Sequence, residues 1–280
     1  MTRVVCAGLA TRDTILRVPE HPPADGRAVA EERVVAGGGP AATAAVALAR
    51  LGVEAAFVGA VGDDEAGLFV AEGLAAEGVD VSALAVVPGA RTAESVVLVS
   101  PGARSIVHIP DTASVPPLRS TLENAAWLHV DHTGFGHVRR LPPDMPVRVS
   151  VDGGVPIDGL DLRGVALYAP TEETLRAQLG GIDEALAAGA ELVVVTRGAA
   201  GSLAAGRRGE RVEAPAVEVD AVSTLGAGDV FHGALLAWLV RGASLAEALR
   251  AANTAAALSC RALDGRSAIP TLDELERRLA

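Results

Sequence analysis

The chain has 280 residues, half of them hydrophobic, and its 24 basic against 35 acidic side chains give a formal charge of −11. This length can bury one large core, so we expect a single domain over residues 1–280. The negative charge argues against nucleic acid or an anionic membrane as the main partner, because both are anionic themselves. Ordinary solubility explains the same charge without any functional meaning.

Two cysteines, Cys6 and Cys260, lie far apart in apolar surroundings. They cannot supply a disulfide framework or a cysteine metal cluster, and they fit a reducing cytoplasm. The first ten residues lack the long apolar stretch of a signal peptide, and no uncharged apolar run approaches the about 20 residues of a membrane span. We therefore expect a soluble, cytoplasmic protein with no membrane contact.

Short β-type runs alternate with helical stretches rich in alanine and leucine. Buried strands are expected at Val4–Gly8, Ala56–Val61, Trp127–Val130, Val147–Val151, Val165–Tyr168 and Leu192–Thr196. Helices are expected at Pro40–Leu51, Glu65–Glu77, Glu172–Leu179 and Ile182–Ala188. Strands separated by helices predict an α/β fold with a mainly parallel sheet covered on both faces.

Two regions break this alternation. Ser95–Val99 and Ser105–Ile109 are β-rich runs joined by a turn containing Pro101 and Gly102, and residues 13–36 lack a helical period. Together they predict a small β flap from about residues 13–36 and 93–109, of the kind that closes over a substrate. An ordinary edge hairpin explains the same residues equally well.

The last third of the chain changes character. It predicts a hairpin of two strands, Ser202–Ala205 and Arg211–Ala214. Three helices are expected to follow, at Asp229–Arg241, Leu245–Ser259 and Leu272–Leu279. The last helix opens with a capping box that begins at Thr271.

The most informative segment is Ser223–Gly233, which reads Ser-Thr-Leu-Gly-Ala-Gly-Asp-Val-Phe-His-Gly. Its glycines allow a tight turn, and the free amides at the start of the following helix form an anion site. A carboxylate beside bound phosphate is costly unless it has a task. Accepting the proton of a hydroxyl that attacks phosphorus is such a task for Asp229. The bland alternative is that Asp229 is only the N-cap of the helix.

Gly226-Ala227-Gly228-Asp229 resembles the signature of the ribokinase-like (PfkB) carbohydrate kinases. Further segments resemble the family's motifs in the family's order: Gly37–Ala42, Val58–Asp64, Val195–Gly201, Ala252–Ala256 and Gly265–Pro270. The resemblance implies a ribokinase-like three-layer α/β sandwich with a mainly parallel central sheet and a small β lid. The signature looks closer to the ketohexokinase-like and sulfofructose-kinase-like branches than to ribokinase proper.

The resemblance also implies roles for individual residues. Asp229 is the catalytic base, and the amides of Gly226, Ala227 and Gly228 hold the γ-phosphate. The remaining roles are acceptor contacts from Asp13, Gly38 and Gly39, and nucleotide contacts from Thr196, Gly198, Gly201 and Asn253. Asn253 could equally be an interior helix residue with an exposed side chain. The cofactors implied are ATP and Mg²⁺, with Mg²⁺ held largely by phosphates and water.

Three positions depart from the family pattern. Thr43 stands where an acceptor-binding asparagine is often found, and it can still hydrogen-bond. Ser223 replaces an aspartate that helps to hold an activating monovalent cation, so activation by such a cation is in doubt. Thr171-Glu172-Glu173-Thr174 lacks both fixed residues of the family's N-x-x-E segment; either glutamate could substitute, or both could be surface charge at a helix start.

Four polar residues near the end of one predicted strand allow several interpretations: His129, Asp131, His132 and His137. They could hold a metal, line the acceptor pocket, or lie in an ordinary loop. We expect no protein metal site.

The sequence therefore predicts a kinase that moves the ATP γ-phosphoryl to a primary hydroxyl of a sugar or sugar-like acceptor, such as a ketose, sulfo-sugar or sugar acid. A homodimer through the β lid is implied by the resemblance. The alternatives are a nucleoside kinase of the same fold and a catalytically impaired nucleotide- or sugar-binding protein. A dinucleotide-dependent oxidoreductase would need an N-terminal strand followed by G-x-G-x-x-G, which the chain lacks.

Overall fold

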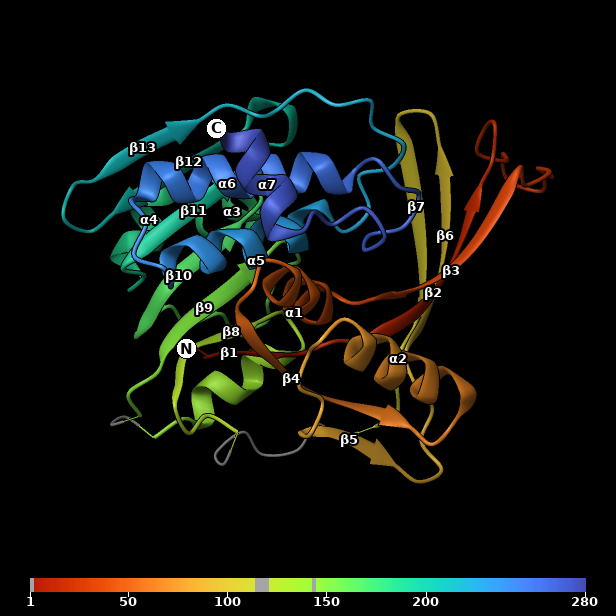
Figure 1. The fold of residues 1–280 in the computed structure, drawn as a ribbon, viewed down its shortest axis with the longest axis horizontal. Coiled ribbons are helices and arrows are strands. Elements are labelled where there is room, and N and C mark those ends of the chain that lie inside the picture. The colour runs from red at the N-terminus through yellow and green to blue at the C-terminus, as the bar shows by residue number, and fades with distance from the viewer. Residues whose placement is uncertain (1–2, 114–120, 143–144) are drawn as a thin grey trace.

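The computed structural model describes residues 3–113, 121–142 and 145–280. A nine-stranded sheet forms its centre, in the order β13-β12-β11-β10-β9-β8-β1-β4-β5 (Figure 1). These strands are β1 (Arg3–Ala7), β4 (Glu54–Gly62), β5 (Leu84–Val87), β8 (Ala125–Val130), β9 (Arg148–Gly153), β10 (Val165–Pro170), β11 (Leu192–Thr196), β12 (Ser202–Gly206) and β13 (Arg211–Ala214). Neighbours from β5 to β11 pair in parallel, while β12 and β13 add an antiparallel edge.

Two apolar layers cover the faces of this sheet. Alternate residues of β1 point to opposite faces, so Val4 and Cys6 enter one layer while Val5 and Ala7 enter the other. The first layer contains buried residues of α1 (Pro40–Arg50), α2 (Glu65–Ala76), α5 (Ala227–Leu239), α6 (Leu245–Ser259) and α7 (Leu272–Leu279). The second contains those of α3 (Glu172–Leu179), α4 (Ile182–Ala187) and the 3-10 helix η1 (Gly134–Arg140).

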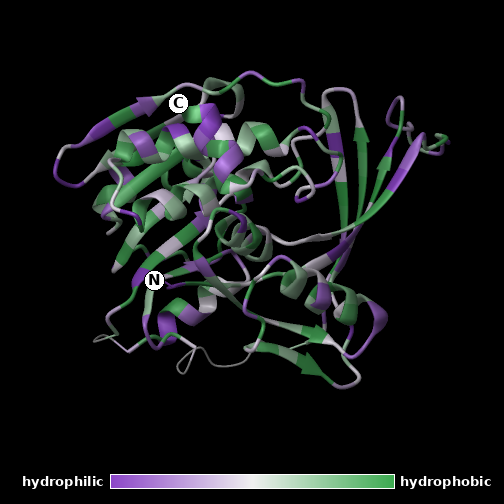
Figure 2. Cartoon of the chain, in the orientation of Figure 1, coloured by the Kyte–Doolittle hydropathy of each residue, from purple (hydrophilic) through white to green (hydrophobic). Residues whose placement is uncertain are grey.

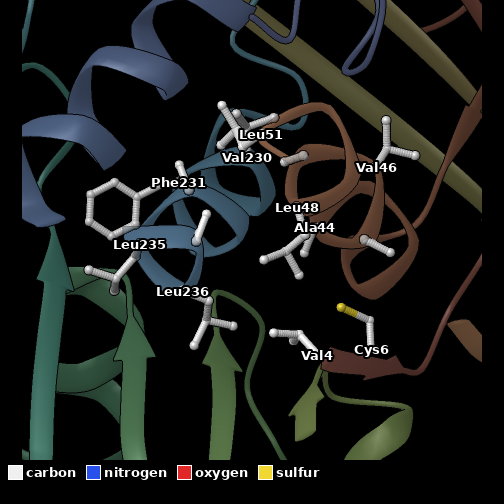
Figure 3. Packing of buried hydrophobic residues seen from close by; sticks show 14 of the residues in the cluster. Val4, Cys6, Ala44, Val46, Leu48, Leu51, Val230, Phe231, Leu235 and Leu236 are labelled. Carbon is white, nitrogen blue, oxygen red and sulfur yellow. The ribbon is translucent and has the colours of Figure 1, made fainter. Parts of the chain in front are cut away.

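The small side chains of α1 and α5 allow these helices to pack closely. Figure 3 shows Leu48 and Ala44 of α1 facing Val230 and Leu236 of α5, above Val4 and Cys6 of β1. A Cβ atom on Gly233 would lie only 2.6 Å from the Ala44 carbonyl oxygen, so glycine is required where the helices touch. This contact fixes the height of α5, and with it the Gly226–Asp229 segment, above the sheet.

A second sheet of four strands projects from the body in the order β3-β2-β6-β7 (Figure 1). It consists of β2 (Thr11–Arg17), β3 (Glu32–Gly38), β6 (Glu94–Ser100) and β7 (Ala103–Ile109). These strands fall in the two segments in which the sequence predicted a flap. Ile15, Val97 and Val99 form the apolar inner face of this lid sheet, together with Leu263 and Leu225 from the body. Figure 2 shows hydrophilic and hydrophobic residues mixed along the lid strands, and α7 as a largely hydrophilic outer helix.

The predicted α/β fold with a mainly parallel sheet is confirmed, and each expected strand and helix has a counterpart in the structure. Strand β5 was not expected, because Leu84–Val87 is too short to give a clear pattern. Helix α5 begins two residues earlier than predicted, at Ala227. Within the described residues, no helix has the length and hydrophobicity needed to cross a membrane.

Candidate active site

The loop before α5 ends in a left-handed turn at Gly226, whose φ is 73°. A Cβ atom there would lie 2.8 Å from Cα of Gly265, so glycine is required both for the backbone angle and for the close approach. No side chain caps the helix start. The amides of the first turn have no acceptor within the helix, and they point with the positive end of the helix dipole toward the loop. This is an anion-binding geometry.

Asp229 is the third residue of α5, and Gly226 occupies the N-cap position. The N-cap interpretation of Asp229 is therefore wrong. Burial raises the pKa of the Asp229 carboxyl to about 7, with Asp152 and Asp131 acting in the same direction and His232 and Arg266 opposing them. A carboxylate with a pKa near neutrality is suited to accept a proton, because a large share of it is ionised at neutral pH and it is more basic than an ordinary carboxylate.

Asp13 and Gly38 meet on neighbouring strands of the lid sheet. Asp13 is buried on β2, and Thr11 Oγ1 donates to its Oδ1 over 2.7 Å. Thr11 is paired with Gly38 on β3, and a Cβ atom on Gly38 would overlap the Asp13 carboxylate. Gly39 follows at the N-cap of α1 with φ 91°, where a side chain would strike the Leu9 carbonyl oxygen. The structure thus brings Asp13, Gly38 and Gly39 together.

Arg266 is a residue of this group that the sequence did not single out. Its buried guanidinium donates from Nε to Thr43 Oγ1 over 3.1 Å and from Nη2 to the Gly38 carbonyl over 2.6 Å. Burial lowers its pKa to about 10, with Asp13 and Asp229 opposing the shift, so it stays charged at neutral pH. The Thr43 hydroxyl, predicted to contact the acceptor, is therefore engaged by this arginine. The one sequence feature that could have pointed to Arg266 is that it is the single charged residue of the Gly265–Pro270 motif.

The predicted nucleotide residues gather around the end of β11 and the start of the β13–α5 connection. Thr196 closes β11, and Gly198 and Gly201 take positive φ angles of 56° and 84° in the turn that follows. A side chain on Gly201 would overlap the Ala214 carbonyl oxygen. Asn253 on α6 donates from Nδ2 to that same carbonyl over 3.1 Å and to the Pro215 carbonyl over 3.0 Å. Asn253 is buried, so the expectation of an exposed side chain is wrong.

The polar residues after β8 separate into two groups. Asp131 is buried and accepts from the amides of Leu9 (2.7 Å), Thr133 (2.9 Å) and Gly134 (2.9 Å), so it ties loops together. His129 lies inside β8, with Nδ1 3.0 Å from Ser150 Oγ. Its neighbours are Asp152 and His232, and one donor atom from each of the three lies within 4.8 Å of the others.

The remaining departures from the family pattern have local partners. Ser223 Oγ accepts from the Leu225 amide over 3.2 Å. Thr171 caps α3 by accepting from the Thr174 amide over 3.1 Å, and Glu172 pairs with Arg176 at 3.0 Å. From the lid, Arg104 donates to Thr224 Oγ1 over 2.6 Å and so touches the loop that precedes the anion site.

Comparison with known proteins shows which proteins share this sequence and fold. The ATP-dependent ribose-1-phosphate kinase of Halopiger xanaduensis is 33% identical over 291 aligned residues, covering 98% of this chain and 96% of that protein. The fructokinase of Klebsiella pneumoniae is 31% identical, covering 86% and 91%. The structure of Arabidopsis thaliana ribokinase complexed with ribose and ATP shares the fold, with a TM-score of 0.83 at 24% identity over 99% of this chain and 98% of that one.

The family model for pfkB family carbohydrate kinases matches residues 1–149 and 163–272, which includes both glycine motifs and the segment ending in Asp229. The family resemblance seen in the sequence is confirmed. The chain belongs to the pfkB family of carbohydrate kinases and is an ATP-dependent enzyme that phosphorylates sugars.

Proposed function

We propose that this kinase transfers the ATP γ-phosphoryl group to a primary hydroxyl of a sugar-like acceptor, with Asp229 as the general base. The observation that carries the proposal is the position of Asp229 in the first turn of α5, beside the helix-start amides that follow the Gly226 turn. A base and an anion site on the same helical turn fit a reaction in which a hydroxyl loses its proton while it attacks a phosphate.

In this mechanism the acceptor lies between the lid sheet and α5. Asp13 accepts from acceptor hydroxyls, and the backbone of Gly38 and Gly39 lies against the sugar, since side chains there would fill the space. Asp229 takes the proton of the attacking hydroxyl. The amides of Gly226, Ala227 and Gly228 hold the charge of the transferred group, which is the main electrostatic contribution expected for phosphoryl transfer.

The nucleotide is proposed to lie along Thr196, Gly198, Gly201 and Asn253. Gly201 and Asn253 both contact the Ala214 carbonyl, which supports a shared task in shaping one binding surface. The proposed task of Asn253 is to hold the chain at Ala214 and Pro215 beside the adenosine.

Mg²⁺ is proposed to arrive with the nucleotide and to offset its phosphate charge. In the part of the chain that the structure describes, the one converging set of potential metal ligands is His129, Asp152 and His232, and all three are buried. That set is poor in the oxygen ligands that Mg²⁺ prefers. The residues therefore fit a phosphate-bound, water-rich Mg²⁺ better than a protein cage. Ser223 keeps monovalent-cation activation a doubtful prediction.

Acceptor choice is the open chemical question, and the relatives suggest the panel. Coupled ADP release with Mg-ATP would be measured against ribose, ribose 1-phosphate, ketoses, sulfo-sugars, sugar acids and nucleosides. We expect the wild type to turn over one of these acceptors. Asp229→Asn should reduce that turnover by about 10²–10⁴-fold. Unchanged turnover in Asp229→Asn would reject the base assignment. ATP binding without turnover on any acceptor would favour the impaired binding protein.

A homodimer through the lid sheet is proposed because apolar side chains on edge strand β7 face solvent. Ile106, Val107 and Ile109 are 51%, 65% and 38% exposed. Light scattering of Val107→Glu should show a monomer if this face joins two copies, and a wild-type monomer would reject the dimer. The cytoplasmic location remains a prediction from the cysteine content.

A further inference from the structure

A cluster of buried polar side chains that the proposed reaction does not use lies next to Asp229. His232 follows Asp229 by three residues on α5, so the two side chains share one face of the helix. Beneath it are Asp152, at the end of β9, and His129 on β8. Their exposed fractions are 4% for His232, 5% for Asp152 and 0% for His129.

The geometry couples His232 to Asp152 rather than to His129. Asp152 Oδ2 lies 3.2 Å from His232 Nδ1, and its Oδ1 accepts from the Gly154 amide over 2.7 Å. The Tyr168 ring fills the space where a side chain on Gly153 would lie, so the strand end that carries Asp152 is tightly packed. The rings of His129 and His232 are 5.7 Å apart between centroids, and His129 Nδ1 faces Ser150 Oγ instead.

The charges follow from these contacts. Burial alone lowers the pKa of His232, but Asp152, Asp229 and a hydrogen bond to the Ala169 backbone outweigh it, and the net pKa is raised. Burial would raise the pKa of Asp152, but His232 more than offsets this and holds it at about 2. Burial lowers the pKa of His129 to about 3. The cluster therefore holds one imidazolium, one carboxylate and one neutral imidazole.

Few other charges face this pair and Asp229. Arg266 and Asp131 act on Asp229 from the C-terminal loop and from the end of β8, with opposite signs. Tyr168 on β10 stays neutral, because burial and Asp152 raise its pKa to about 12.

The two helices packed against α5 carry their charges elsewhere. In α1 the sole charged residue, Arg50, pairs with Glu77 at 2.6 Å. In α6, Glu247 bonds Ser244 in the helix cap, and Arg250 donates to the Leu279 carbonyl on the exposed side.

We propose that Asp152 and His232 form a positioning pair for the catalytic base: the His232 imidazolium opposes the protonation of Asp229 that its burial and the Asp152 carboxylate favour, and Asp152 keeps that imidazolium charged. The proposal rests on the proposed function, because it assigns the pair to the base of that reaction. Without His232, Asp229 would face the buried Asp152 charge alone and would protonate at higher pH. Without both partners, their opposing effects would disappear together.

The decisive measurement is the pH profile of kcat/KM for the acceptor at saturating Mg-ATP. In His232→Gln the acid limb should move to higher pH by about 1–2 units, the range expected for loss of a neighbouring opposite charge. In the double variant Asp152→Asn/His232→Gln it should return to the wild-type position or slightly below. His129→Gln is the matched control, since it removes a buried but neutral histidine from the same cluster, and its acid limb should not move. An unmoved limb in His232→Gln would overturn the proposal.

A measurement on the wild-type protein covers variants that fold poorly and acceptors that stay unidentified. NMR titration should show a His232 pKa above the ordinary histidine value of about 6.5, and Asp229→Asn should lower that pKa. A neutral His232 at pH 7, or one equivalent of bound transition metal in the purified protein, would overturn the proposal. If the His232 pKa is raised and responds to Asp229→Asn in a protein that shows no kinase turnover, the proposed function is rejected. The electrostatic pairing of Asp152 with His232 would still stand.

Discussion

The two halves of the proposed site are built in different ways. On the acceptor side, Asp13, Thr43 and Arg266 are buried and charged or polar, and a side-chain hydrogen bond joins Arg266 to the distant Thr43. On the nucleotide side, Gly198 and Gly201 shape a turn, and the Asn253 side chain bonds only main-chain carbonyls. The acceptor half is thus specified by side chains, and the nucleotide half mostly by the course of the backbone.

On the proposed assignment, this difference would let related kinases share a nucleotide surface while they differ in acceptor. A surface formed by main-chain atoms can keep its shape when side chains change. Buried side-chain networks fail when one partner is removed, because the remaining groups lose their hydrogen bonds in a place without water. Substitutions on the acceptor side should therefore have the larger effects.

The largest effect is expected for Arg266→Met, which keeps an apolar side chain of similar length and removes the charge. Gly38 and Thr43 lose their donor, and Asp13 loses a cation that lowers its pKa. We expect a loss of about 3–6 kcal/mol in unfolding free energy, since two hydrogen bonds from a charged donor contribute about 1.5–3 kcal/mol each, together with severe loss of acceptor binding. Urea unfolding and acceptor KM measure both effects. Adding Asp13→Asn should restore part of the stability; if it does not, the two charges are not coupled.

A smaller effect, confined to the acceptor, is expected for Gly38→Ala. The new methyl group would overlap the Asp13 carboxylate and move it. A displacement of about 1 Å in a catalytic site can cost about 10²-fold, so we expect a fall of that order in kcat/KM for the acceptor. The nucleotide KM should stay unchanged. Gly73→Ala in exposed α2, where nothing lies within 4 Å, is the control and should leave the kinetics alone. Equal losses for both substrates would contradict the division into halves.

On the nucleotide side, Asn253→Ala removes two hydrogen bonds to the chain at Ala214 and Pro215. We expect a cost of about 1–3 kcal/mol in stability from the unpaired carbonyls and a rise of about tenfold in the KM for ATP. The adjacent Thr254→Val is the control, because Thr254 bonds only the Arg250 carbonyl of its own helix. A change in the KM for the acceptor, with the KM for ATP unchanged, would contradict the assignment of Asn253 to the nucleotide side.

The smallest effect is expected for Arg104→Ala. Arg104 is exposed, and its 2.6 Å hydrogen bond to Thr224 joins the lid to the loop before the anion site. Surface contacts of this kind contribute about 0–1 kcal/mol, so kcat/KM should fall less than about fivefold. The fall caused by Arg104→Ala should be smaller at high salt. A loss comparable to that of Gly38→Ala would mean that lid position depends mainly on this contact.

The sequence predicted the features that depend on the local backbone better than those that depend on contacts between distant side chains. The anion loop was recognisable because Gly226 is required locally by the backbone, and Asp229 follows it by three residues. Helices rich in alanine and strands rich in valine showed their periods in the sequence. The role of Arg266 could not be predicted, because its partner Thr43 lies 223 residues away and an arginine gives no sign of being buried.

The Asp152–His232 pair was missed for a related reason. The structure buries His232, and its partner Asp152 comes from β9, some 80 positions earlier in the chain. His129 was considered together with Asp131, His132 and His137, which are its neighbours in sequence. The pleat of β8 turns His129 toward Asp152 instead, and the side chains that meet across a sheet are decided by strand order, which the sequence did not give.

The bond between Arg266 and Gly38, 228 residues apart, has a consequence for how the protein is made. During synthesis, the segment with Asp13, Gly38 and Thr43 is complete long before Arg266 leaves the ribosome. Until then Asp13 has no buried cation beside it. A nascent chain can therefore complete the acceptor side of the site only after nearly every residue has been added.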